Sequence, residues 1–149
     1  MSSVKLTVVG GGSTYTPELV DGIAARPEEL DVSEIVLVDP DESRLGVVGP
    51  FCERMLRHAG HPARLWTTAD LERGAADADA VLLQLRVGGQ QARRSDETFP
   101  LVCGCIGQET TGAGGLAKAL RTVPVVLDIA RRVRRVSRGW LVNFTNPVG

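Results

Sequence analysis

The sequence lacks the marks of several common classes of protein. Its 149 residues carry a formal net charge of −1, so no overall field attracts nucleic acid or an anionic membrane, and we expect neither as a partner. No apolar run approaches the ~20 residues of a membrane span. The apolar run of residues 4–9 is too short for the apolar part of a signal peptide. The sequence therefore indicates a cytoplasmic protein with one globular domain.

Cysteine and histidine are also scarce. The three cysteines, Cys52, Cys103 and Cys105, are too few and too scattered for a disulfide framework, which favours a reducing compartment. A zinc site needs about four ligands, and Cys103 and Cys105 have no second pair nearby. The two histidines, His58 and His61, lie far along the chain from the glycine motifs, and we expect both on the surface. We therefore expect no metal site in this chain.

The chain does contain a regular alternation of short apolar segments with longer amphipathic ones. This rhythm is typical of βαβ units and a parallel sheet. Strands are expected at residues 5–9, 34–38, 64–67, 80–85 and 140–144. Helices are expected at residues 17–26, 42–58, near Leu71 and at 116–136. We therefore predict a Rossmann-type, doubly wound α/β fold with a parallel sheet of order 3-2-1-4-5.

Three expectations concern less regular parts of this pattern. Pro50 should kink or split the second helix, and Pro124 should bend the last one. Apolar residues recur every three or four positions in the last helix and predict its buried face: Leu116, Leu120, Val123, Leu127 and Ala130. Residues 86–115 are rich in glycine and read as a long irregular loop, which in a compact α/β domain is usually functional.

A glycine-rich turn joins the first strand to the first helix. A chain that turns sharply here and brings its backbone close to a ligand excludes side chains, and its N–H groups then face an anion at the helix N-terminus. Thr16 is expected as the N-cap of the helix, and Tyr15 stands where a dinucleotide fingerprint has its third glycine. The turn predicts a cofactor-binding loop made of Gly10, Gly11, Gly12, Ser13 and Thr14.

Asp39 ends the second strand and supports the same interpretation. A carboxylate at this position accepts hydrogen bonds from the adenosine ribose and repels a 2′-phosphate, which predicts NAD rather than NADP. The alternative is that Asp39, Pro40 and Asp41 form an ordinary turn that caps the next helix.

The glycine turn and three further blocks resemble the family 4 glycoside hydrolases, the NAD- and manganese-dependent 6-phospho-glucosidases, α-galactosidases and their relatives. The resemblance covers essentially the whole chain and leans toward the 6-phospho-β-glucosidases. The Gly-Gln-Glu-Thr-Thr-Gly block is its most specific part. The four blocks are Gly10-Gly11-Gly12-Ser13 with Thr16-Pro17-Glu18-Leu19, Gln84-Leu85-Arg86-Val87-Gly88-Gly89, Ile106-Gly107-Gln108-Glu109-Thr110-Thr111-Gly112, and Asn143-Phe144-Thr145-Asn146-Pro147.

The resemblance implies an unusual route of glycoside hydrolysis, outside the two-carboxylate scheme. NAD removes hydride from C3 of the sugar, a tyrosine removes the acidified C2 proton, the aglycone leaves by elimination, and water and hydride are then returned. A metal ion, Mn²⁺ or another divalent cation, stabilises the enediolate in the full-length enzyme. The substrate implied is a small glycoside, phosphorylated or not.

The resemblance also implies roles for individual residues. Arg94 matches a substrate-binding arginine, with Arg93 as the alternative one position earlier. Asn146 matches a substrate-binding asparagine, and Glu109 matches the acidic residue that raises the basicity of the catalytic tyrosine. We place Arg86, at the end of the fourth strand, with the cofactor-binding residues, because ligands collect at the carboxyl edge of such a sheet.

The family's metal ligands, proton donor and catalytic tyrosine lie beyond the last matching block. We therefore expect residues 1–149 to be the NAD(P)-binding domain of a larger glycosidase, without its catalytic and metal-binding domain and inactive alone. An exposed sheet edge predicts self-association as a homo-oligomer. Two alternatives stay open: a 2-hydroxy-acid dehydrogenase of the lactate or malate type, and a stand-alone NAD-binding sensor.

Overall fold

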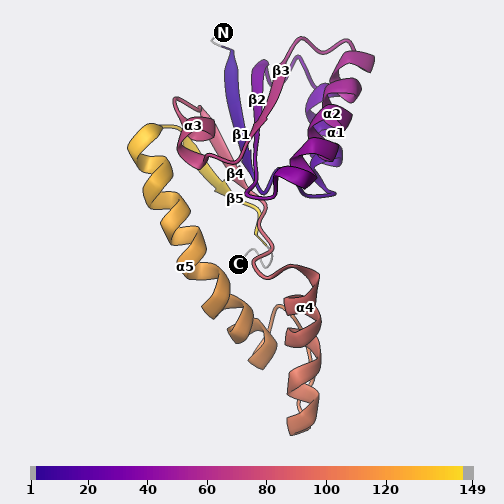
Figure 1. Ribbon diagram of the computed structural model, residues 1–149, viewed down its shortest axis with the longest axis vertical. Coiled ribbons are helices and arrows are strands. Elements are labelled where there is room, and N and C mark those ends of the chain that lie inside the picture. The colour runs from indigo at the N-terminus through magenta and orange to yellow at the C-terminus, as the bar shows by residue number, and fades with distance from the viewer. Residues whose placement is uncertain (1–2, 146–149) are drawn as a thin grey trace.

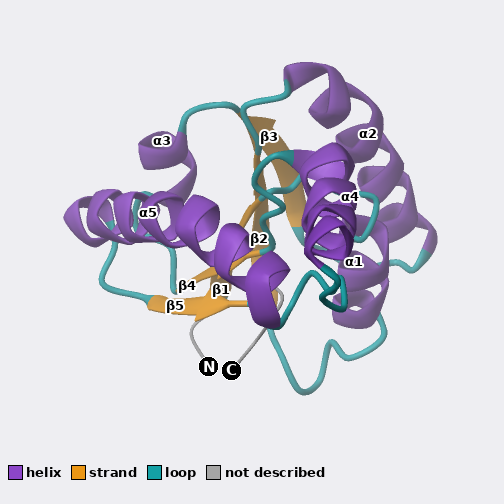
Figure 2. Ribbon diagram, turned by 90° about the horizontal axis from the view of Figure 1, so that it is seen from below, coloured by secondary structure: helices purple, strands orange, loops and turns teal. Residues whose placement is uncertain are grey.

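The computed structural model describes residues 3–145 and contains a five-stranded parallel sheet with helices on both faces (Figures 1 and 2). The strands are β1 (Val4–Val9), β2 (Val32–Val38), β3 (Arg64–Thr68), β4 (Ala80–Leu83) and β5 (Trp140–Asn143). They lie in the order β3-β2-β1-β4-β5, which confirms the predicted Rossmann-type topology. The strand boundaries differ from the predicted ones by one or two residues.

Two helical layers bury the two faces of the sheet. Helices α1 (Thr16–Ala24) and α2 (Glu42–His58) cover one face, while α3 (Leu71–Ala75) and the second half of α5 (Gly112–Val136) cover the other (Figure 2). Successive residues of β2 alternate between the two cores: Ile35 and Leu37 pack under α2, whereas Val36 and Val38 pack under α3. This part of the molecule, with residues 125–136 of α5, is referred to below as the body.

A second part projects beyond the carboxyl ends of the strands (Figure 1). It consists of α4 (Gly89–Thr98), the 3-10 helix η1 (Phe99–Cys103) and the first half of α5. We refer to residues 86–124 as the arm. The expectation that residues 86–115 form an irregular loop is wrong, because α4 and η1 occupy much of this segment and α5 begins at Gly112.

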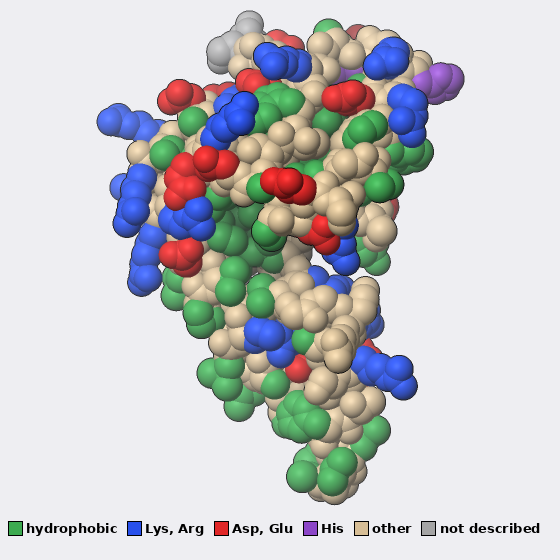
Figure 3. Space-filling view, in the orientation of Figure 1, with side chains coloured by type: hydrophobic (Ala, Val, Ile, Leu, Met, Phe, Trp, Pro, Cys, Tyr) green, Lys and Arg blue, Asp and Glu red, His purple; other side chains and the backbone are tan. Residues whose placement is uncertain are grey.

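The predicted buried face of α5 is also wrong. Leu116, Leu120, Val123 and Leu127 are 61%, 69%, 52% and 49% exposed. The first half of α5 packs against α4 through its opposite side, where Gly114, Lys118 and Thr122 are buried. Further along the helix, Ile129 and Val133 provide the contact with the sheet. The apolar repeat therefore marks a real helical stripe, but that stripe faces away from the described structure (Figure 3).

The sequence predicts that Pro50 either kinks or splits the second helix. The helix is not split, because α2 continues from Glu42 to His58. A proline ring inside a helix collides with the carbonyl group four residues earlier, which here belongs to Gly46. Gly49 is buried against β3, since a Cβ there would lie 2.6 Å from Thr67 Cγ2. Helix α5 likewise continues across Pro124.

Apolar surface also remains uncovered beside β5. All four residues of this edge strand are exposed, and Trp140 is 81% exposed. A groove of about 660 Å³ lies between α1 and the end of β4, with Leu19, Ile23, Leu82 and Phe144 among its lining residues. Within residues 3–145, no helix combines the length and the hydrophobicity that crossing a membrane requires.

Candidate functional site

The glycine turn lies at the carboxyl end of β1, between β2 and β4. The N–H groups of Gly10 and Gly11 donate to Val38 O at 2.8 and 3.0 Å, which extends the contact of β1 with β2 into the turn. Gly10 has φ +86°, and a Cβ there would lie 2.6 Å from Gln84 O. A Cβ on Gly12 would lie 2.9 Å from Asp39 Oδ2. Backbone conformation and close approach therefore require glycine at both positions.

Helix α1 starts directly after this turn, and its start differs from the expectation. Thr16 is the first helical residue rather than the N-cap, and the N-cap residue, Tyr15, makes no side-chain capping bond. The hydroxyl of Thr16 is instead buried and accepts a hydrogen bond from Gln84 Nε2 at 2.6 Å. The positive N-terminal end of α1 is thus left without a side-chain cap, an arrangement suited to an anionic ligand.

The carboxylate of Asp39 lies beside the same turn. Its Oδ2 accepts from Gly12 N at 3.0 Å and its Oδ1 accepts from Asp41 N at 2.9 Å. Asp41, not Asp39, caps α2, by accepting from Arg44 N at 3.1 Å. Hydrogen bonds from Ser43 and from Arg44 N lower the pKa of Asp41. The cap and the loop contact therefore use different carboxylates, which leaves the remaining lone pairs of Asp39 for a ligand.

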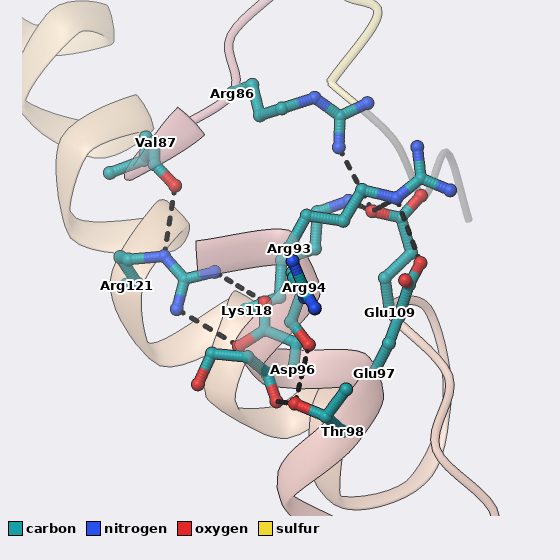
Figure 4. A network of polar contacts seen from close by, with 11 residues as sticks. Arg86, Val87, Arg93, Arg94, Asp96, Glu97, Thr98, Glu109, Lys118 and Arg121 are labelled. Carbon is teal, nitrogen blue, oxygen red and sulfur yellow. Dashed lines mark hydrogen bonds and ion pairs between the residues drawn. The ribbon is translucent and has the colours of Figure 1, made fainter. Parts of the chain in front are cut away.

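A cluster of charged side chains surrounds Glu109 where the arm joins the body (Figure 4). Glu109 Oε2 lies 3.0 Å from Arg86 Nη1, 3.3 Å from Arg93 Nε and 3.4 Å from Lys118 Nζ. Burial by itself would raise the pKa of Glu109, but the charge of Lys118 and the hydrogen bond from Arg86 lower it below its usual value. We call Arg86, Arg93, Glu109 and Lys118 the Glu109 cluster; its carboxylate is ionised at neutral pH.

The predicted substrate-binding residues are Arg94, with Arg93 as its alternative, and Asn146. Arg93, the alternative to Arg94, faces Glu109 and also pairs with Glu97 at 2.9 Å, whereas Arg94 is exposed (Figure 4). The role of Arg94 stays a prediction. Asn146 lies outside the described residues.

A buried ion pair fixes the arm next to the cluster. Arg121 of α5 donates to both carboxylate oxygens of Asp96, at 2.6 and 3.3 Å, and its Nε donates to Val87 O at 3.0 Å (Figure 4). The Asp96 side chain is only 3% exposed. Arg121 thereby joins three segments, α4, α5 and the turn that follows β4.

Sequence reasoning missed Lys118 and Arg121. A signal was available, because they are the only charged residues between positions 112 and 127. Their spacing of three places them on one helix side, opposite the apolar stripe.

The described residues fit a dinucleotide better than a metal ion. The glycine turn, the uncapped start of α1 and Asp39 have the arrangement expected of a dinucleotide site. Within residues 3–145, no group of three or more His, Cys, Asp or Glu side chains could hold a metal ion.

Comparison with known proteins gives a consistent result. The sequence profile described as "Family 4 glycosyl hydrolase" matches residues 5–149. The 6-phospho-beta-glucosidase of Escherichia coli (strain K12) is 48% identical over 149 residues, which cover 98% of this chain and 33% of that protein.

Solved structures match in the same way. The 6-phospho-beta glucosidase from Thermotoga maritima, solved with NAD and glucose-6-phosphate, has a TM-score of 0.92 and 39% identity over 99% of this chain and 35% of that one. A 6-phospho-alpha-glucosidase from gut microorganisms, solved with NAD and Mn²⁺, has a TM-score of 0.93 and 33% identity, covering 98% and 34%. The chain thus spans about a third of the length of the relatives that it matches.

Proposed function

The chain belongs to family 4 of the glycosyl hydrolases, as the sequence blocks suggested, and from that premise we propose that it is the NAD-binding domain of a 6-phospho-β-glucosidase. In this proposal, residues 1–149 hold the cofactor, while the metal and the catalytic tyrosine belong to another part of a longer enzyme. The β preference is supported by the higher identity to a 6-phospho-beta-glucosidase, 48%, than to a solved 6-phospho-alpha-glucosidase, 33%.

The observation that carries the proposal is the glycine turn at the uncapped start of α1, with the carboxylate of Asp39 hydrogen-bonded to Gly12 N at 3.0 Å. The backbone of the turn and the N-terminus of α1 would hold the pyrophosphate, and Asp39 would accept from the adenosine ribose. These roles fall to Gly10, Gly11, Gly12, Ser13, Thr14 and Asp39. When bound, NAD supplies a hydride acceptor for the sugar.

The second half of the site is proposed at the Glu109 cluster. Arg86 would contact the cofactor, and Arg94 (or Arg93) with Asn146 would bind the phosphoglycoside. Arg86, Arg93 and Lys118 keep Glu109 ionised. Its negative charge would then raise the basicity of the catalytic tyrosine of the longer enzyme.

Calorimetric titration of the chain with NAD and with NADP tests the cofactor assignment. We expect NAD to bind at least about tenfold more tightly than NADP, because the Asp39 carboxylate repels a 2′-phosphate. Asp39→Asn keeps the size of the side chain but removes its charge, so it should narrow this ratio. Failure to bind NAD would overturn the proposal, and equal binding of NAD and NADP would overturn the role of Asp39 alone.

Two further parts of the proposal concern the setting of the protein. We propose a cytoplasmic location, supported by three free cysteines, two of which are exposed. We also propose a homo-oligomer, supported by the uncovered apolar surface of α5 and β5.

Family membership favours the hydrolase over a 2-hydroxy-acid dehydrogenase. A stand-alone NAD sensor would instead be indicated if the natural polypeptide bound NAD but contained no further domain.

A further inference from the structure

Gln84 lies in one of the sequence blocks that point to the family, yet none of the proposed roles uses it. It follows β4 directly, and its backbone N–H still donates to Val9 O at 3.0 Å. Its side chain turns toward the glycine turn, where Nε2 donates to Gly10 O at 3.2 Å and to Thr16 Oγ1 at 2.6 Å. One amide group therefore bonds both the first residue of the turn and the first residue of α1.

The chemistry of the two acceptors fixes the orientation of this amide. Gly10 O is a carbonyl oxygen and can only accept, so the NH₂ group of Gln84 must face it. The contact is also crowded, since a Cβ on Gly10 would lie 2.6 Å from the backbone oxygen of Gln84. The Thr16 hydroxyl is buried, so its bond with Gln84 is protected from competing water.

The turn is thus held from both neighbouring strands. Gln84, from the β4 side, bonds its two ends, and Asp39, from the β2 side, bonds Gly12 N in its middle. A loop held in this way loses little conformational freedom when a ligand binds.

We infer that Gln84 is a positioning residue for the dinucleotide: through its bonds to Gly10 O and Thr16 Oγ1 it holds the glycine turn in the shape that accepts a pyrophosphate. This inference rests on the proposed function, because it needs a ligand with a pyrophosphate. It assigns Gln84 a part in the affinity of the site through the turn, without direct contact with the reacting atoms.

The test compares ligands with and without a pyrophosphate on the intact chain. Gln84→Met keeps the length of the side chain and removes the amide donor, and Thr16→Val removes the hydroxyl with little change of shape. We expect each variant to bind NAD and ADP about five- to tenfold more weakly, the effect of losing one or two hydrogen bonds. Binding of adenosine, followed by NMR titration because it is weak, should stay unchanged. Gln90→Met, at an exposed position on α4, is the matched control and should change nothing.

The double variant separates a specific bond from a general loss of structure. If Gln84 acts through Thr16, the second substitution should add much less than its separate effect. Circular dichroism checks that each variant is folded, and Thr16→Val decides the question if Gln84→Met does not fold. An unchanged affinity for NAD in folded variants, or an equal loss for adenosine, would overturn the inference. Wild-type protein that binds neither NAD nor ADP would overturn the proposed function instead.

Discussion

The body and the arm are built by different forces, although they are continuous in the chain. In the body, strands with alternating side chains bury two apolar cores, and residues such as Val8, Ile35 and Leu37 have no exposed surface. In the arm, the buried positions include Asp96, Lys118 and Thr122, while the large apolar side chains point outward. The body is held mainly by the hydrophobic effect, and the arm depends on ion pairs and hydrogen bonds.

This difference matters for the candidate site, because one half of the site belongs to the body and the other half belongs to the arm. The glycine turn is hydrogen-bonded to residues at the ends of β2 and β4, Val38, Asp39 and Gln84. The Glu109 cluster lies in the arm, where the charges that would act on a ligand also hold the local structure. A substitution in the cluster is therefore expected to change structure and chemistry together.

The largest difference between the body and the arm is expected for a matched pair of leucine substitutions. Leu37→Ala removes a fully buried side chain from the body and should lower the free energy of unfolding by roughly 2–5 kcal/mol. Leu120→Ala removes a side chain that is 69% exposed in the arm and should change it by less than about 0.5 kcal/mol. Urea denaturation measures both values. A large loss for Leu120→Ala would mean that the outer stripe of α5 is buried in solution, for example between copies of the chain.

The sequence predicted the body well and the arm poorly, for a reason that these two leucines illustrate. The strands of the body are short apolar runs, and such runs identify buried residues because both faces of the sheet are covered within the same segment of chain. Leu116, Leu120, Val123 and Leu127 carry an equally clear helical period. That period locates an apolar stripe but cannot say what covers it. The arm packs instead through Gly114, Lys118 and Thr122, which no apolar pattern marks.

The site divides in the same way. Gly10, Gly12 and Asp39 stand out as candidates from local signals, since the turn and its carboxylate follow strand ends. The Glu109 cluster joins residues 86, 93, 109 and 118, and only the fold of the arm brings them together. Gln84 was visible only as part of a matching block, because its bond to Thr16 spans 68 positions. Thr16 was misassigned as an N-cap because this partner was not visible in the local sequence.

A matched pair of arginines gives the next largest effect. Arg121→Met leaves the Asp96 carboxylate buried without its partner, which we expect to destabilise the arm by about 2–3 kcal/mol. Arg132→Met removes an equally close pair in the body, with Glu72, but both of those side chains are about 40% exposed. The hydrogen bond from Arg132 lowers the pKa of Glu72 to about 2. An exposed ion pair of this kind nevertheless contributes little to stability, so we expect a much smaller effect from Arg132→Met.

Hydrogen exchange followed residue by residue distinguishes the two variants. Arg121→Met should speed exchange in α4 and the first half of α5 and leave β1 and β2 unchanged, because the arm can open without the body. Arg132→Met should leave both regions close to the wild type. If Arg121→Met speeds hydrogen exchange in β1 and β2 as much as in the arm, then the body and the arm unfold as one unit. That result would contradict the idea that the two parts are stabilised separately.

The cysteines report the same contrast without any change in stability. Cys52 belongs to the same apolar core as Leu37 and has no exposed surface, and burial raises the pKa of its thiol to about 11. Cys103 and Cys105 are exposed in the arm. A thiol reagent at pH 8 should therefore label Cys103 and Cys105 at once and Cys52 only when the body opens, since the thiolate is the reactive form.

Leu37→Ala should speed labelling of Cys52 because it weakens the core that contains both residues, and Arg121→Met should not. Rapid labelling of all three thiols in the wild type would mean that α2 is loosely packed on the sheet, and the body would then not be the more rigid part.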